Sequence, residues 1–122
     1  MKVLVVDDEE DIRQIASLSL TRLGGMDVLN AASGSEGVTE AETGHPDVIL
    51  LDVMMPGMDG PATFAALRRN PRTAAIPVIF LTAATTPDDL ARLRGLGAAA
   101  VLPKPFDPVE LPQLVRSVLP GK

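Results

Sequence analysis

The chain has 122 residues, 46% of them hydrophobic, and its 11 basic and 16 acidic side chains give a net charge of −5 at pH 7. This is the length of one domain with its own core, so we expect a single domain over residues 1–122. The negative charge gives no general attraction for a phosphate backbone, and we expect no direct nucleic-acid partner. The absence of cysteine excludes disulfides and thiolate metal sites, and it is compatible with a cytoplasmic location. The amino-terminal residues are too acidic for a signal peptide, and no apolar run approaches the about 18 residues of a membrane span, so we expect no membrane association.

Five apolar runs alternate with five helical patterns along the chain. The runs lie at about residues 2–6, 26–31, 47–52, 78–81 and 98–102. The third is apolar on both faces, which is typical of a central parallel strand. Alternation of strand and helix predicts an α/β fold in which helices cover both faces of a parallel sheet.

The first two helices are predicted from an apolar stripe and from a cap. The first helix stops before Gly24 and Gly25. Its apolar stripe consists of Ile12, Ile15, Ala16, Ser19, Leu20 and Leu23. Ser33 followed by Glu36 has the spacing of a capping box and predicts a second helix over residues 34–43.

The later helices are predicted from their first residues. Pro61 suits the first turn of the third helix, and Thr86 is the N-cap of the fourth. Asp107 predicts the start of the fifth in the same way, but Pro112 would then lie beyond the first turn and remove a backbone hydrogen bond. The fifth helix therefore either begins later or is kinked at Pro112. Its apolar face consists of Leu111, Leu114, Val115, Val118 and Leu119.

Polar side chains follow four of the apolar runs directly. Asp7 and Asp8 follow the first run and Asp52 ends the third, while Thr82 follows the fourth and Lys104 the fifth. Taken singly, each has an ordinary explanation, because acids often cap strands in solvent and lysines usually extend over the surface. The carboxyl ends of parallel strands meet at one edge of the sheet, where open α/β sheets bind their ligands. We therefore expect these five side chains to lie close together.

The chain resembles the receiver domain of response regulators in two-component signalling systems, of the chemotaxis-receiver kind. The resemblance rests on four motifs at successive strand ends, which are paired acids, an Asp, a Thr and a Lys-Pro pair in this order. The resemblance extends over residues 2–119. It implies a flavodoxin-like, doubly wound sheet with strand order 2-1-3-4-5 and five helices. It also implies that the chain accepts a phosphoryl group from a histidine kinase or phosphotransfer protein and signals to a downstream effector protein. The signalling surface would be the fourth helix, fifth strand and fifth helix, and the length predicts a stand-alone receiver without an output domain.

The resemblance assigns roles to three strand-end residues. Asp52 would be the phosphoacceptor, and Lys104 would neutralise the charge of the phosphoryl oxygens. Thr82 would donate a hydrogen bond to one of those oxygens and move inward as it does so. A cis peptide bond between Lys104 and Pro105 is implied as well. Such a receiver assists its own phosphorylation and dephosphorylation but is not an enzyme that turns over a separate substrate.

Convergent carboxylates repel one another and favour a bound cation. Mg²⁺ suits them, because it is a hard ion that takes oxygen ligands and often bridges carboxylates to a phosphoryl group. By resemblance, Asp8 and Asp52 would bind Mg²⁺ directly, Asp7 would act largely through water, and the backbone carbonyl of Met54 would complete the protein ligands. We expect Lys104 alone to offset the charge of the three acids.

Two other classes of function stay open at this point. A Mg²⁺-dependent phosphohydrolase of the haloacid-dehalogenase type also uses an Asp nucleophile, but that class resembles Asp-x-Asp after its first strand, whereas Asp7 and Asp8 are adjacent here. A receiver-like interaction module that is never phosphorylated would be expected to lack Asp52 or Lys104. Val101 stands where many receivers carry an aromatic residue, so the usual coupling through a moving ring is not available. His45, in a loop, is expected to be solvated.

Overall fold

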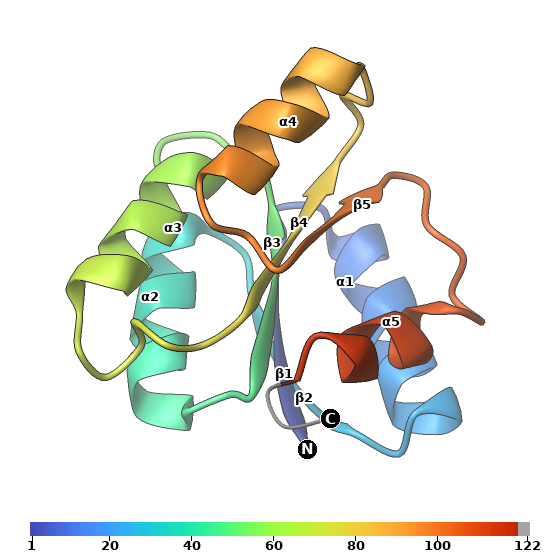
Figure 1. Cartoon of the computed structure of the whole chain (residues 1–122). Helices are drawn as coiled ribbons and strands as arrows, with labels where there is room; N and C mark the ends of the chain where they lie inside the picture. Colours follow the sequence, from blue (N-terminus) through green and yellow to red (C-terminus); the bar gives the residue numbers. More distant parts are fainter. Residues whose placement is uncertain (120–122) are drawn as a thin grey trace.

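A five-stranded parallel sheet forms the centre of the computed structural model, which describes residues 1–119 (Figure 1). The strands follow the order β2-β1-β3-β4-β5, which confirms the predicted order and the flavodoxin-like class. Their bounds are β1 Lys2–Val6, β2 Asp27–Ala31, β3 Val48–Asp52, β4 Val78–Thr82 and β5 Ala100–Pro103. The fifth strand thus begins two residues later than the apolar run that predicted it.

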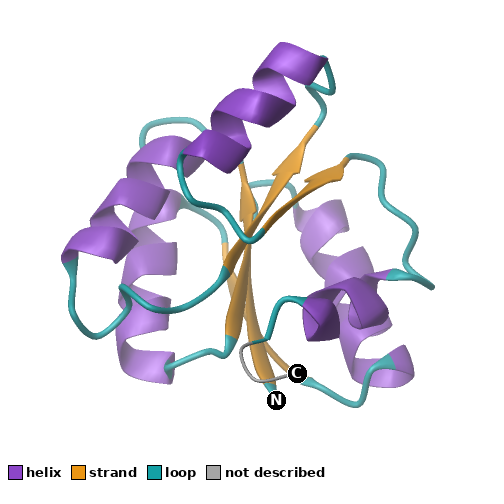
Figure 2. Ribbon diagram, in the orientation of Figure 1, coloured by secondary structure: helices purple, strands orange, loops and turns teal. Residues whose placement is uncertain are grey.

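Helices cover both faces of the sheet (Figure 2). They are α1 Glu10–Leu18, which continues as the π-helical turn η1 Ser19–Leu23, then α2 Gly34–Gly44, α3 Gly60–Arg69, α4 Pro87–Gly95 and α5 Leu111–Ser117. One core cluster joins the sheet to α1 and α5, and a second joins it to α2, α3 and α4. None of the helices within residues 1–119 has the length and hydropathy that a bilayer-spanning segment requires.

The two central strands explain why Asp52 is held firmly. Every residue of β3 and of β4 is buried, as expected of strands with helices on both sides. β3 pairs with β4 in a parallel register that sets Asp52 opposite Leu81. The carboxylate therefore stands at the end of a strand that is fixed from both faces and both edges.

The first helical segment differs from the predicted stripe. A π turn holds more residues than an α turn, so the positions that follow it are rotated away from α-helical spacing. Leu20 is fully buried as expected, but Leu23 is 59% exposed and Ile15, at the margin of the stripe, is 43% exposed. The prediction was therefore wrong for Ile15 and Leu23.

Side-chain caps define the starts of the helices. Ser33 accepts a hydrogen bond from the Glu36 N–H, but the Glu36 carboxylate reaches back to the N–H of Ala32 rather than that of Ser33. Thr86 caps α4 as predicted. His45 is exposed in the left-handed conformation that ends α2, with φ 48°.

The fifth helix begins late, which confirms one of the two alternatives that Pro112 left open. Asp107 Oδ1 accepts a hydrogen bond from the Val109 N–H at 2.9 Å, so it caps the preceding turn and not the helix. Pro112 then lies in the first turn of α5, where no N–H is required. Leu111 and Val115 are buried on its apolar face. The tail that begins at residue 120 lies outside the described residues.

Candidate functional site

The carboxyl ends of β1, β3 and β5 bring a lysine between two buried carboxylates. Asp7, whose N–H donates to the Ala31 carbonyl, is fully buried, and Asp52 is 3% exposed. The Lys104 N–H donates to the Thr82 carbonyl at 2.9 Å, which ties the loop after β5 to the end of β4. The Lys104–Pro105 peptide bond is cis, as the resemblance implied.

Lys104 is the charged centre of this arrangement. Its Nζ lies 2.8 Å from Asp7 Oδ2 and 3.1 Å from Asp52 Oδ1, and its side chain is only 12% exposed. Glu9 Oε1 lies 3.5 Å from the same nitrogen. One ammonium therefore offsets three carboxylates, which leaves the cluster with an excess of negative charge.

Burial and the neighbouring charges alter the proton affinities of Asp52 and Lys104. Burial and the negative charge of Asp7 raise the pKa of Asp52 from 3.8 to about 6, although Lys104 and the Met54 N–H oppose this shift. Burial alone would lower the pKa of Lys104, but its hydrogen bonds to Asp7 and Asp52 and their charges outweigh burial and raise it. Lys104 therefore stays protonated, while Asp52 holds its proton more tightly than an exposed carboxyl does.

The acids fit a divalent cation. Asp7, Asp8 and Asp52 each offer a carboxylate oxygen, and these oxygens lie within 4.8 Å of one another. Asp7 Oδ2 is buried, and within residues 1–119 the Lys104 ammonium at 2.8 Å is its compensation. A hard cation such as Mg²⁺ takes carboxylate oxygens of this kind and would relieve their repulsion.

Met54 and Thr82 flank the cluster. The Met54 N–H donates to Asp52 Oδ1 at 3.4 Å, while the Met54 side chain is 74% exposed. Thr82 is buried, and its hydroxyl accepts from the Ala84 N–H at 3.0 Å. In this conformation Thr82 is therefore bonded to its own loop. A pocket of about 300 Å³ opens over Asp52, and its lining also includes Met54 and Lys104.

Three residues near the site were not predicted from the sequence. Glu9 pairs with Lys104, and Arg13 donates to the backbone carbonyl of Asp7 at 2.7 Å. Within residues 1–119 only Lys104 forms ion pairs with Asp7 and Asp52, as expected. A Cβ at Gly60 would lie 2.5 Å from the Asp52 carbonyl oxygen, so only glycine lets α3 begin so close to the end of β3. Glu9 follows the paired acids directly and could have been included. No sequence signal marked the contacts of Arg13 and Gly60.

Comparison with known proteins agrees with this arrangement. The family model of the response regulator receiver domain matches residues 3–116, and the chain belongs to this family. The chain is 34% identical over 121 residues to Protein PilG of Pseudomonas aeruginosa, and the match covers 99% of this chain and 89% of that protein. The crystallised chemotaxis protein CheY4 of Vibrio cholerae has a TM-score of 0.89 and 37% identity, with 97% of this chain and 98% of that chain covered.

Other relatives are longer proteins. The chain is 40% identical over 118 residues to the alkaline phosphatase synthesis transcriptional regulatory protein PhoP of Bacillus subtilis, with 97% of this chain and 48% of that protein covered. The chain thus spans about half the length of the first curated relatives that it matches. Membership of the receiver family leaves no support for the alternative of a haloacid-dehalogenase-type phosphohydrolase.

Proposed function

We propose that this receiver accepts a phosphoryl group on Asp52, with Mg²⁺ bound by the neighbouring acids, and passes the signal to a partner protein. The observation that carries the proposal is the position of Lys104, whose Nζ lies 3.1 Å from Asp52 Oδ1 beside an open pocket. A transferring phosphoryl group is strongly anionic, and a buried, fixed ammonium is suited to stabilise it.

The transfer would proceed at one Asp52 oxygen. This oxygen attacks the phosphorus of a phosphohistidine in a histidine kinase or phosphotransfer protein, so that an O–P bond forms while the P–N bond breaks. The imidazole of the donor keeps the electron pair and takes a proton from solvent. The attacking carboxylate must be ionised, and with a pKa of about 6 most Asp52 side chains are ionised at pH 7. Because the chain is consumed as the acceptor, we propose no turnover of a separate substrate.

Metal binding would involve the acids of β1 and β3. Mg²⁺, when bound, would supply positive charge for the phosphoryl oxygens. Asp8 and Asp52 would hold it directly, Asp7 largely through water, and the Met54 carbonyl would complete the protein ligands. Lys104 would remain hydrogen-bonded to Asp7 and keep the Asp52 carboxylate oriented.

Signalling would begin at Thr82. We propose that its hydroxyl leaves Ala84 and donates to a phosphoryl oxygen, which would move the exposed loop of residues 83–86 and α4. α4 contributes a single fully buried side chain, Leu93, so little core packing resists this movement. Val101, partly buried against the core, has no ring to change rotamer, and the backbone of the loop would therefore carry the signal.

The output would be contact with an effector protein through α4, β5 and α5. We propose a cytoplasmic location for this receiver, and the match to Protein PilG covers 89% of that protein. Several of the longer relatives are named as transcriptional regulators. We assign no DNA contact to the receiver, because its net charge is −5.

Intact mass after incubation with acetyl phosphate and Mg²⁺ tests the proposal. We expect one added phosphoryl group in the parent protein and none in Asp52→Asn. Asp59→Asn is a matched control from the same loop, because Asp59 caps α3 and Asn caps helices about as well. Phosphate on Asp7, Asp8 or His45, or an adduct that persists in Asp52→Asn, would contradict the assignment of the acceptor.

A further inference from the structure

Lys104 has as many acidic neighbours as it has N–H donors. An ammonium group carries three N–H donors and accepts no hydrogen bond. The acidic neighbours of Lys104 Nζ are Asp7 Oδ2 at 2.8 Å, Asp52 Oδ1 at 3.1 Å and Glu9 Oε1 at 3.5 Å. A phosphoryl group on Asp52 would need one of these donors for its own oxygens. One carboxylate must therefore release Lys104 when the phosphoryl group arrives.

Glu9 is the carboxylate that can leave. Its side chain is 62% exposed, whereas those of Asp7 and Asp52 are 0% and 4% exposed. Glu9 also has the longest of the three distances to Lys104. An exposed carboxylate is held weakly in an ion pair, because water competes for it and a long side chain loses freedom when it pairs. Asp7 has no such route into solvent, and Asp52 is the proposed acceptor itself.

The backbone of Glu9 would stay in place if its side chain turned away. The Glu9 N–H donates to Asp7 Oδ1 at 2.9 Å, and the Glu9 carbonyl accepts from the Arg13 N–H at 3.2 Å. Glu9 is the N-cap residue of α1, but its side chain makes no capping hydrogen bond there. Within the described part of the chain, Lys104 is the one partner of this carboxylate. Its release would therefore cost α1 no cap.

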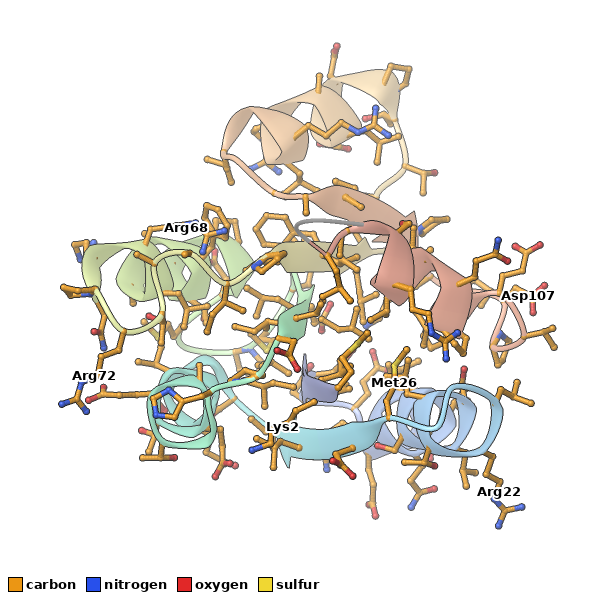
Figure 3. The ribbon with its side chains drawn as sticks, turned by 60° about the horizontal axis from the view of Figure 1, so that its bottom comes forward. Lys2, Arg22, Met26, Arg68, Arg72 and Asp107 are labelled. Carbon is orange, nitrogen blue, oxygen red and sulfur yellow. The ribbon has the colours of Figure 1, made fainter. Side chains whose placement is uncertain are left out.

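Glu9 stands where a phosphoryl group would have to enter. It lines the pocket of about 300 Å³ over Asp52, as Lys104 does. Among residues 1–119, Lys104 is the only basic side chain that lines this pocket. Lys2 begins β1 and Arg72 precedes β4, so these two cations lie at the opposite edge of the sheet, which faces the reader in Figure 3. An entering anion and the Glu9 carboxylate would therefore compete for the same ammonium.

We infer that Glu9 is a built-in competitor of the phosphoryl group for Lys104. In the unphosphorylated protein its carboxylate takes the third donor of Lys104, and on phosphorylation it gives up this position and turns into solvent. Acceptance of the group is opposed twice, because Lys104 must first lose a partner and because the displaced charge stays close to an anion. Glu9 acts through Lys104 and is therefore a positioning residue. The inference rests on the proposed acceptor role of Asp52 and adds the residue that limits how readily the group is accepted.

Calorimetric titration with beryllofluoride, a mimic of the phosphoryl group, tests the competition at equilibrium. In saturating Mg²⁺ we expect Glu9→Gln to lower the dissociation constant about fivefold, which is the effect of one unit charge about 4 Å away in water. Gln has the same shape as Glu but no charge, so it competes less well for an ammonium. Glu10→Gln is the matched control, because Glu10 is an exposed neighbour of the same charge outside the lining of the pocket. This control should bind beryllofluoride within about twofold of the parent protein, since water and salt screen its charge.

The rate of phosphorylation by acetyl phosphate tests the same contact during transfer. Asp52 attacks the phosphorus, and acetate leaves with the electron pair of the broken P–O bond. At subsaturating acetyl phosphate and low salt, Glu9→Gln should react about fivefold faster than the parent protein, because the donor is itself an anion. The advantage should shrink as KCl is raised to about 1 M, where charges are screened over about 3 Å. A purely structural effect of the substitution would not depend on salt in this way.

Three results would overturn the inference and leave the acceptor site intact. The first is equal affinity and rate in the parent protein and Glu9→Gln. The second is an equal gain in Glu9→Gln and Glu10→Gln, which would assign the effect to net charge and not to the contact with Lys104. The third is weaker binding or slower transfer in Glu9→Gln, because Glu9 would then assist the site. A parent protein that neither binds beryllofluoride nor takes up a phosphoryl group would instead refute the proposed function, and this inference with it.

Discussion

Replacing Asp52 by Asn should stabilise the protein, and by an amount that depends on pH. Asp52 is buried beside Asp7, and these two causes raise its pKa from 3.8 to about 6. A raised pKa means that the fold disfavours the ionised carboxylate. The penalty is absent below pH 3.8, grows between pH 3.8 and 6, and is complete above pH 6. An Asn side chain carries no charge at any of these pH values and has no such penalty.

The magnitude follows from the two pKa values. The interval from 3.8 to about 6, at about 1.36 kcal/mol per pH unit, corresponds to about 3 kcal/mol. The pocket over Asp52 is open to solvent, which weakens electrostatic effects, so we take about 3 kcal/mol as a ceiling and about half of it as the expected gain. The loss of one partner for Lys104 is already included, because Lys104 opposes the raised pKa.

Urea denaturation between pH 4 and pH 8, in buffer with a chelator to remove divalent metal, measures this effect. Urea is uncharged and does not screen the cluster as guanidinium chloride would. The free energy of unfolding of Asp52→Asn, minus that of the parent protein, should be near zero at pH 4 and rise to a plateau above pH 6. Asp27→Asn, an exposed change on β2, should give a small difference at every pH. A difference for Asp52→Asn that is constant with pH, or negative at pH 8, would refute the account of a repelled, buried carboxylate.

The remaining predictions concern the metal, the lysine and the switch. Millimolar Mg²⁺ should raise the melting temperature of the parent protein by mass action and have much less effect on Asp8→Ala. Melting temperatures that are equal with and without Mg²⁺ in both proteins would count against the metal site. Lys104→Ala should lower the free energy of unfolding by about 3 kcal/mol at pH 7, because Asp7 and Asp52 lose their ammonium partner. The loss should be smaller at pH 5, where Asp52 is protonated. A loss that is equal at both pH values would argue against this pairing. The same variant should still be phosphorylated at Asp52 but without the conformational response. Amide exchange with beryllofluoride, which mimics the phosphoryl group, should change protection within residues 82–97, and changes confined to the loop after Asp52 would show that the signal leaves by another surface.

The sequence was sufficient where the cause of a structural feature is local. Alternating apolar runs and helix caps predicted the α/β architecture, because hydrophobic spacing and capping act over a few residues. The late start of α5 was one of two outcomes that Pro112 allowed. The convergence of Asp7, Asp52 and Lys104 also followed from the sequence, because parallel strands must present their carboxyl ends at one edge.

Only the tertiary structure decided which side chains are buried together and how the chain departs from regular spacing. The π turn of η1 turns Leu23 to solvent, and a stripe drawn at α-helical spacing could not predict that rotation. The contact of Glu9 with Lys104 depends on the path of a loop almost a hundred residues away along the chain. The raised pKa of Asp52 depends on how deeply β3 is covered on both faces and on the distances that separate its carboxylate from Asp7 and Lys104. Burial and distance result from packing of the whole chain, and electrostatic energies vary steeply with both, so composition and spacing could place the charges at one edge but could not fix their strength.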